Sequence, residues 1–232
     1  MGQEKEYRHE LKYVCDMAQL RMIEERIKHI CKPDPHAGMD GIYSIRSVYF
    51  DDYRNTCFYE NENGIDPREK FRIRIYDGSM ERIVLECKRK QSGKTHKDSL
   101  ILTKEQCHML LTGEGIDEWE PKLEEKLLNK LMLQYRTKLL RPVVVVEYER
   151  IPYVYDMGNV RITMDCNLKG TKEVGCFEEK EIAGRPIMMA GYHILEVKYD
   201  EFLPDYIYNA LQLKNLRQTA FSKYYLCRKF TN

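Results

Sequence analysis

The stretch FRIRIYDG, residues 71–78, decides the predicted fold because its charged and apolar side chains alternate. Side chains of a β-strand point alternately to its two faces. One face of this stretch therefore carries Arg72, Arg74 and Tyr76. The other face carries Phe71, Ile73 and Ile75. The Asp-Gly pair that follows is typical of a tight turn, so we expect a hairpin that leads into a second strand at residues 81–90.

The same alternation recurs in the other predicted strands. Their polar faces carry Arg8, Glu10 and Lys12; Glu86, Lys88 and Lys90; Tyr148 and Arg150; Arg161, Thr163 and Asp165; and Glu196 and Lys198. An amphipathic sheet with one solvated face is the commonest source of such a pattern. Two features favour another arrangement, because the polar faces are dense in Arg and Lys and several amphipathic helices could cover the apolar faces. A closed barrel with helices outside would place the charges in its lumen.

Such a lumen would need an anionic occupant. It would gather eight cations: Lys12, Arg72, Arg74, Lys88, Lys90, Arg150, Arg161 and Lys198. Only four acids offset them: Glu10, Glu86, Asp165 and Glu196. Like charges repel strongly where the effective dielectric constant is low. The excess suits a polyanion, and the forked guanidinium of arginine suits phosphate oxygens in particular. The carboxylates suit a divalent cation that bridges phosphates.

The predicted elements describe an α+β protein, a closed antiparallel β-barrel tunnel with helices packed outside, in one domain over residues 1–232. Strands are expected at residues 7–14, 43–52, 71–76, 81–90, 142–151, 159–165 and 193–200. Helices are expected at residues 16–30, 103–111, 121–140, 204–213 and 222–230. Asp16 is expected to cap the first helix, and Thr103 with Gln106 to form a capping box. Residues 61–67 are predicted to form a polar loop, and residues 91–99 a basic, flexible loop.

Composition limits the class of protein. The 232 residues carry a net charge of +1, which argues against a general nucleic-acid or membrane-surface protein. No apolar run approaches the roughly 18–20 residues of a membrane span, and the N-terminus is too polar for a signal peptide. The eight cysteines are scattered without a C-x-x-C pair, which predicts reduced thiols instead of a zinc cluster. We therefore expect a cytoplasmic protein.

An ordered set of short motifs resembles a known family. HELKY, YFDD, FRIRIY, LECKRK, VEYER, VRITMD, LEVKYD and SKY occur in the order seen in the VTC (vacuolar transporter chaperone) domain. That domain is the polyphosphate polymerase branch of the triphosphate tunnel metalloenzymes, a CYTH-like superfamily. The resemblance spans residues 7–228. It implies a tunnel in which the γ-phosphoryl group of ATP passes to phosphate or to a growing polyphosphate chain, with Mn²⁺ or Mg²⁺ as cofactor.

The resemblance also implies roles for individual residues. Phosphate binding and catalysis would fall to Lys12, Arg72, Arg74, Lys88, Arg150, Arg161 and Lys198. Further substrate contacts would come from Lys90, Lys97, Ser222 and Lys223. Glu196 would ligate the metal. Glu10 would hold metal, orient Lys12 or orient the attacking group, and the sequence does not choose among these roles.

Two departures from the family pattern bear on function. The hydrolytic tunnel enzymes tend to carry E-x-E-x-K in the first strand, whereas this chain has Arg8 at the first position, which favours the polymerase branch. The eukaryotic members add a phosphate-sensing domain and membrane helices, and this sequence contains neither, so a separate membrane partner could receive the product. Two alternatives stay open: a tripolyphosphatase or nucleoside triphosphatase on the same barrel, and a non-catalytic polyphosphate-binding module.

Overall fold

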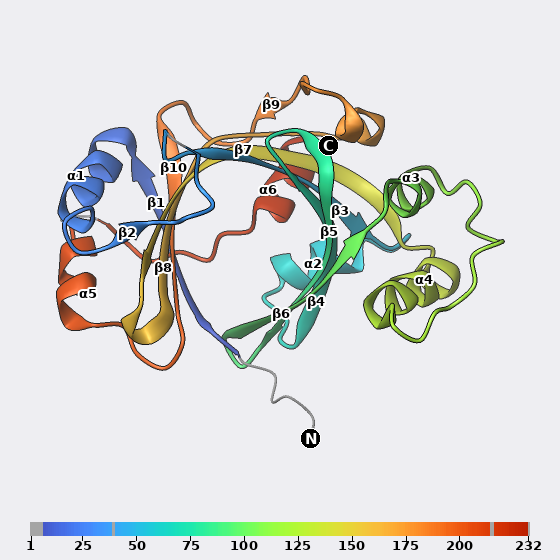
Figure 1. Ribbon diagram of the computed structural model, residues 1–232, viewed down its shortest axis with the longest axis horizontal. Coiled ribbons are helices and arrows are strands. Elements are labelled where there is room, and N and C mark those ends of the chain that lie inside the picture. Colours follow the sequence, from blue (N-terminus) through green and yellow to red (C-terminus); the bar gives the residue numbers. More distant parts are fainter. Residues whose placement is uncertain (1–6, 39, 214–215, 232) are drawn as a thin grey trace.

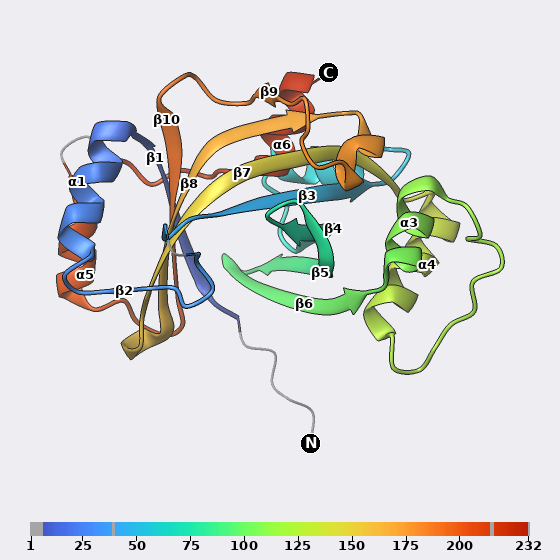
Figure 2. The same ribbon diagram turned by 45° about the horizontal axis from the view of Figure 1, so that its top comes forward.

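A single antiparallel sheet organises the protein, and its strands curl around a central space (Figures 1 and 2). The computed structural model describes residues 7–38, 40–213 and 216–231. Among them the strand order is β1-β10-β8-β7-β3-β4-β5-β6, with β2 beside β7 and β9 beside β8. The strands are β1 (His9–Asp16), β2 (Lys32–Pro33), β3 (Tyr43–Asp51), β4 (Arg68–Tyr76), β5 (Ser79–Gln91), β6 (Lys94–Leu102), β7 (Arg141–Tyr155), β8 (Val160–Thr171), β9 (Arg185–Pro186) and β10 (Tyr192–Tyr199).

The two edge strands of the sheet, β1 and β6, meet at one place. In the described part of the chain they share one isolated bridge, in which the backbones of Arg8 and Thr95 exchange hydrogen bonds of 2.8 and 2.9 Å. Farther along β1, the amide of Thr219 donates a hydrogen bond to the carbonyl of Lys12. The sheet is therefore a curled barrel with one narrow closure, and the fully closed barrel expected from the sequence was slightly overstated.

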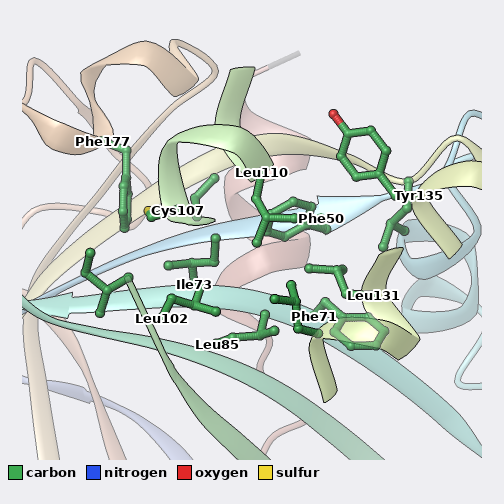
Figure 3. Close-up of a cluster of buried hydrophobic side chains, with 14 of the residues drawn as sticks. Phe50, Phe71, Ile73, Leu85, Leu102, Cys107, Leu110, Leu131, Tyr135 and Phe177 are labelled. Carbon is green, nitrogen blue, oxygen red and sulfur yellow. The ribbon is translucent and has the colours of Figure 1, made fainter. Parts of the chain in front are cut away.

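The apolar faces of β3, β4 and β5 point outwards and are covered by α3 (Lys104–Thr112) and α4 (Lys126–Lys138). Phe71, Ile73 and Leu85 belong to the same buried cluster as Leu110 and Leu131 of these helices (Figure 3). Full burial of such a side chain stabilises a protein by about 1.5–3 kcal/mol. Since neighbouring residues of a strand face opposite ways, this packing turns the charged residues of the same strands inwards.

A second apolar cluster lies outside β1, β8 and β10, beneath α1 (Met17–Ile27) and α5 (Asp205–Leu211). Leu20, Ile23 and Ile27 of α1 are buried there at helical spacing. Asp16 caps α1 as predicted, because its carboxylate accepts a hydrogen bond of 2.7 Å from the amide of Gln19. Thr103 and Gln106 form the predicted capping box at the start of α3.

The C-terminal helix α6 (Lys223–Thr231) departs from the expectation that the helices pack outside. It lies within the curl of the sheet (Figure 1). Tyr224 and Cys227 are buried in a third cluster with Tyr49 and Val146. Tyr49 is the register partner of Arg72, so this cluster lies on the charged, concave face. The amphipathic pattern of α6 predicts that it packs, but it does not specify which face of the sheet it covers.

Three local expectations were wrong. Residues 94–99 of the expected basic loop belong to β6, because Ser92 and Gly93 adopt positive φ angles and turn the chain back along β5. Residues 61 and 62 of the expected polar loop belong to α2 (Thr56–Glu62), in which the amides of Cys57 and Phe58 donate to the carboxylate of Asp51. The helix expected from residue 121 begins at Lys126, so Leu123 lies before it and is 91% exposed.

Candidate functional site

The concave face of the sheet, α6 and the segment before it enclose a cavity of about 930 Å³. Its described lining is strongly basic and includes three glutamates, Glu10, Glu62 and Glu196. The basic side chains are Lys12, Arg68, Lys70, Arg72, Arg74, Lys88, Lys90, Arg150, Lys198 and Lys223. Most of the cations predicted from strand alternation therefore converge on one space.

Glu86 anchors the arginines of β4. Its carboxylate, which is 1% exposed, accepts a hydrogen bond of 2.6 Å from Nε of Arg72. Arg74 lies farther from the same carboxylate, at 3.7 Å, and its other contacts are 3.3 Å to Ser47 and 3.4 Å to the hydroxyl of Tyr148. Burial alone would raise the pKa of Glu86, but the charges of Arg72 and Arg74 hold it well below its ordinary value. Arg74 is consequently the less firmly paired of the two arginines.

Asp165 anchors a second group of cations. Nε of Arg150 lies 2.6 Å from one carboxylate oxygen, and Nζ of Lys223 lies 2.6 Å from the other. Lys223 is the first residue of α6, so the helix delivers this ammonium into the cavity. Burial would raise the pKa of Asp165, but Arg150 and Lys223 lower it. Asp165 is therefore ionised and fixes the two cations without directly lining the cavity.

Glu10 and Glu196 form a third group, among lysines of β1, β5 and β10. Nζ of Lys88 lies 2.7 Å from Glu10, and Nζ of Lys12 lies 3.4 Å from Glu196 and 3.6 Å from Glu10. Burial would raise the pKa values of both carboxyls, but Lys12 and Lys88 lower that of Glu10, and Lys198 and Lys12 lower that of Glu196. Burial lowers the pKa of Lys198 to about 7 against the pull of both glutamates.

The pair Glu10 and Glu196 fits a hard divalent cation. Both are ionised oxygen donors inside an anion-binding cavity, and Mg²⁺ typically takes one or two carboxylates and completes its shell with water and substrate phosphates. The described residues contain no group of three or more His, Cys, Asp or Glu side chains able to hold a metal by themselves. A cation held here would depend on phosphate oxygens for its remaining ligands.

Arg68, Lys70 and Lys90 lie at one end of the cavity and form no ion pair with a described carboxylate within 4 Å. Nζ of Lys70 contacts Asn61 at 2.6 Å and the hydroxyl of Ser222 at 3.3 Å. Burial, reinforced by neighbouring cations, lowers the pKa of Lys70 to about 7. Arg68 and Lys70 were not among the site residues expected from the sequence. Continuing the alternation of β4 backwards from Arg72 would have identified both.

Two predicted site residues do not line the cavity. Lys97 is half-exposed and lies 2.7 Å from Glu86. Arg161 is the register partner of Lys198, but its guanidinium contacts Asp34 and Tyr43. Ser222 does line the cavity, beside Lys223. Arg8, the first residue of the RHELK stretch, pairs with Asp200 at 2.6 Å and is absent from the described cavity lining.

A curled antiparallel sheet around a basic cavity, with an adjacent carboxylate pair, defines an α+β protein with the fold of the tunnel enzymes. The chain belongs to the VTC domain family, whose model matches residues 7–232. This confirms the family predicted from the motifs. No curated protein matches the chain. In the described residues, no helix is both long and apolar enough to cross a membrane.

Several solved structures are similar to this chain. A Hippeastrum protein, described as a candidate adenylyl cyclase with a dominant triphosphatase activity, aligns with a TM-score of 0.57 at 12% identity over 98% of this chain and 97% of its own. A candidate adenylate cyclase from Bacillus halodurans has a TM-score of 0.49 at 12% identity, covering 90% and 88%. The Mimivirus capping enzyme triphosphatase has a TM-score of 0.36 at 12% identity, covering 85% and 81%. The Hippeastrum likeness shows a shared fold.

Proposed function

We propose that this chain is a metal-dependent polyphosphate polymerase, which transfers the γ-phosphoryl group of ATP to phosphate or polyphosphate in its basic tunnel. The observation that carries the proposal is the convergence of ten lysines and arginines with three glutamates on one cavity. A phosphate chain is the ligand that neutralises such an excess along its whole length. Membership of the VTC domain family supports the polymerase over other enzymes of this fold.

The chemistry requires positioning and charge neutralisation more than a protein nucleophile. In the transfer, the bond between the γ-phosphorus and the bridging oxygen of ADP breaks, and a bond to a terminal phosphate oxygen of the acceptor forms. Arg72, Arg74 and Arg150 would hold the phosphoryl oxygens in fixed directions, because buried acids orient their guanidinium groups. Lys223 would add a cation from the helix side.

Glu10 and Glu196 would hold the divalent cation, Mn²⁺ or Mg²⁺. The metal would supply neutralisation of the charge that develops on the phosphate oxygens. In the structure, Lys12 forms an ion pair with Glu196 and Lys88 forms one with Glu10. Substrate phosphate would offer both lysines an alternative anion, so the same side chains would orient the chain while the carboxylates turn to the cation.

A triphosphatase on the same barrel is the second candidate, because hydrolysis needs the same cations and only a different acceptor, water. The Hippeastrum protein of the same fold is described as having a dominant triphosphatase activity. A non-catalytic polyphosphate-binding module is the third candidate. The ionised pair Glu10 and Glu196 argues against it, since two acids weaken a site that only binds anions.

Product analysis separates the three candidates. Purified protein is incubated with ATP and Mn²⁺ or Mg²⁺, and the products are resolved on a polyphosphate gel. A ladder that is lost in Glu196→Gln and kept in the surface control Glu25→Gln supports the polymerase. Orthophosphate without a ladder identifies the hydrolase. Tripolyphosphate binding without metal-dependent turnover identifies the binding module.

We propose that residues 1–232 act as one catalytic domain in the cytoplasm, with ATP and inorganic polyphosphate as its ligands and with no nucleic-acid partner. A separate membrane protein could receive the product. Fractionation of cells that express a tagged chain would test the location, and recovery of the tagged chain in a secreted or luminal fraction would contradict it.

A further inference from the structure

Arg161 is turned away from the cavity that its strand position predicts for it. Its register partner on β10, Lys198, lines the cavity. The guanidinium of Arg161 instead lies 2.7 Å from a carboxylate oxygen of Asp34 and 3.0 Å from the hydroxyl of Tyr43. Its Nε is buried and finds no acceptor among the described residues. Arg161 therefore keeps an unused donor beside the phosphate-binding cations.

Asp34 is built into this position by its own segment. The residue follows β2, and its amide donates a hydrogen bond of 3.0 Å to the carbonyl of Pro152 on β7. One carboxylate oxygen accepts hydrogen bonds of 2.9 Å from the amide and from Nδ1 of His36, while the other faces Arg161. Burial would raise the pKa of Asp34, but His36 and Arg161 lower it. Its side chain is 5% exposed and ionised.

We propose that Asp34 is a built-in competitor for Arg161, which occupies the anion position of this arginine until a phosphate chain long enough to reach it takes over. A carboxylate and a phosphate offer a guanidinium the same forked arrangement of oxygens. Asp34 would thus set the length of chain that the tunnel grips. A triphosphate within the cavity would leave the pair intact, whereas a longer chain would recruit Arg161.

The charge distribution supports a competitor at this place. Arg68, Lys70 and Lys90 also line the cavity but form no ion pair with a described carboxylate within 4 Å, so a phosphate chain that binds them displaces no paired acid. Among the described residues, Asp34 is the one acid that pairs with Arg161. The two ends of the chain-binding path therefore differ in how strongly they hold an added phosphate. The inference rests on the proposed function, because it assumes that phosphate chains are the ligand.

The test is calorimetric titration without ATP or metal, with two probes: tripolyphosphate and long-chain sodium polyphosphate. Asp34→Asn keeps an oxygen for the amide of His36 and removes the charge that faces Arg161. We expect the affinity for the long chain to rise about fivefold. The affinity should also fall more steeply with salt concentration, by a slope that corresponds to roughly one more released counterion. Tripolyphosphate affinity should change less than about twofold, because this probe does not reach Arg161.

Two control variants isolate the pair. Asp40→Asn removes the same charge from the same segment. Its carboxylate accepts a hydrogen bond from the amide of Ile42 and pairs with no arginine of the described ranges, so this variant should leave long-chain affinity unchanged. Asp34→Asn combined with Arg161→Gln should lose the gain, because the released arginine is then missing. Melting curves of all variants confirm that each is folded.

The outcomes separate this inference from the proposed function. Unchanged or weaker long-chain binding in folded Asp34→Asn overturns the competitor, as does a gain that persists without Arg161. An equal gain for tripolyphosphate overturns the assignment to chain length. A third outcome is possible: wild-type protein binds polyphosphate, Asp34→Asn shows the Arg161-dependent gain, and no ladder forms from ATP. That outcome would contradict the polymerase and support Asp34 as the competitor.

Discussion

Arg150 and Asp165 face each other across β7 and β8 and form a two-pronged ion pair. Nε and Nη2 of the arginine lie 2.6 and 2.8 Å from the two carboxylate oxygens, and the two residues are register partners. The carboxylate is completely buried. Removal of Arg150 would leave Asp165 with Lys223 as its only strong partner among the described residues.

Arg150→Ala should therefore lower stability as well as activity. Breaking a buried pair by removal of one partner lowers the free energy of unfolding by about 3–5 kcal/mol. Because Lys223 still pairs with Asp165, we expect a loss of about 3 kcal/mol. Chemical denaturation measures the free energy of unfolding. Addition of Asp165→Asn should recover part of the loss, because the orphaned charge is gone. A stable Arg150→Ala protein would show that the pair does not contribute to folding.

Arg74→Ala should affect activity and stability differently. Arg74 is buried beside Arg72 and Arg150, with its nearest acid at 3.7 Å, so its removal relieves like-charge crowding. We expect kcat/KM to fall at least about 100-fold, as for loss of a transition-state donor, and the melting temperature to move by less than about 3 °C. Steady-state assays and thermal melts are compared on one preparation. A large drop in melting temperature would make this arginine a structural residue.

Binding of tripolyphosphate should weaken as the pH rises, because Lys70 loses its proton. Its pKa of about 7 means that the side chain is charged below that pH and neutral above it. An anion favours the charged form, so the affinity advantage of wild type over Lys70→Met should be large near about pH 6 and nearly absent near about pH 9. Tripolyphosphate also ionises across this range, but its ionisation affects both proteins equally and cancels in the ratio of their affinities, measured by titration. A ratio that stays constant with pH would show that Lys70 does not titrate in this range.

The same shift predicts a stability trend of known sign. The unfolded lysine keeps its ordinary pKa of 10.5, so between about pH 7 and that value the unfolded chain binds more protons than the folded one. The contribution of Lys70 to the free energy of unfolding should rise with pH across this window. Lys70→Met should flatten the rise in denaturation experiments. An equal slope in both proteins would contradict the buried, neutral lysine.

Gly170 on β8 should be intolerant of a side chain. A Cβ at this position would lie 2.5 Å from Sγ of Cys227 on α6, closer than nonbonded atoms approach. Gly170→Ala should displace α6 and cost about 1–3 kcal/mol, or roughly 2–10 °C in melting temperature. Tripolyphosphate affinity should fall too, because Lys223 begins this helix. Addition of Cys227→Ala to Gly170→Ala should restore part of the melting temperature and part of the tripolyphosphate affinity. If the effects of the two substitutions simply add, the clash is not with Cys227.

The alternation of charged and apolar residues predicted the strands well, because each strand has one face against a helix-covered core and one against the cavity. Phe71 and Leu85 had to be buried, and that fixed the direction of Arg72 and Glu86. Capping at Asp16 and Thr103 was also local and was confirmed. These features depend on spacing within one element, which a sequence displays directly.

Features set by distant partners were not predictable in this way. The position of Arg161 is decided by Asp34, on a segment far from it in the sequence, and strand alternation alone assigned the arginine to the tunnel. The placement of α6 inside the barrel depends on the close approach that Gly170 permits. Lys70 lay one alternation step outside the quoted motif, and Ser92 with Gly93 converted an apparent loop into a hairpin.

Two backbone hydrogen bonds between Arg8 and Thr95 hold the edges of the barrel together. Local opening of a protein begins where few hydrogen bonds and few packed side chains resist it. At this seam the tip of the β5–β6 hairpin can move away from β1 once the ion pair between Lys88 and Glu10 is also released, while Leu85 and Leu102 keep their contacts in the first hydrophobic cluster. The bore of the barrel can therefore widen for a bulky occupant at a small fraction of the free energy of global unfolding.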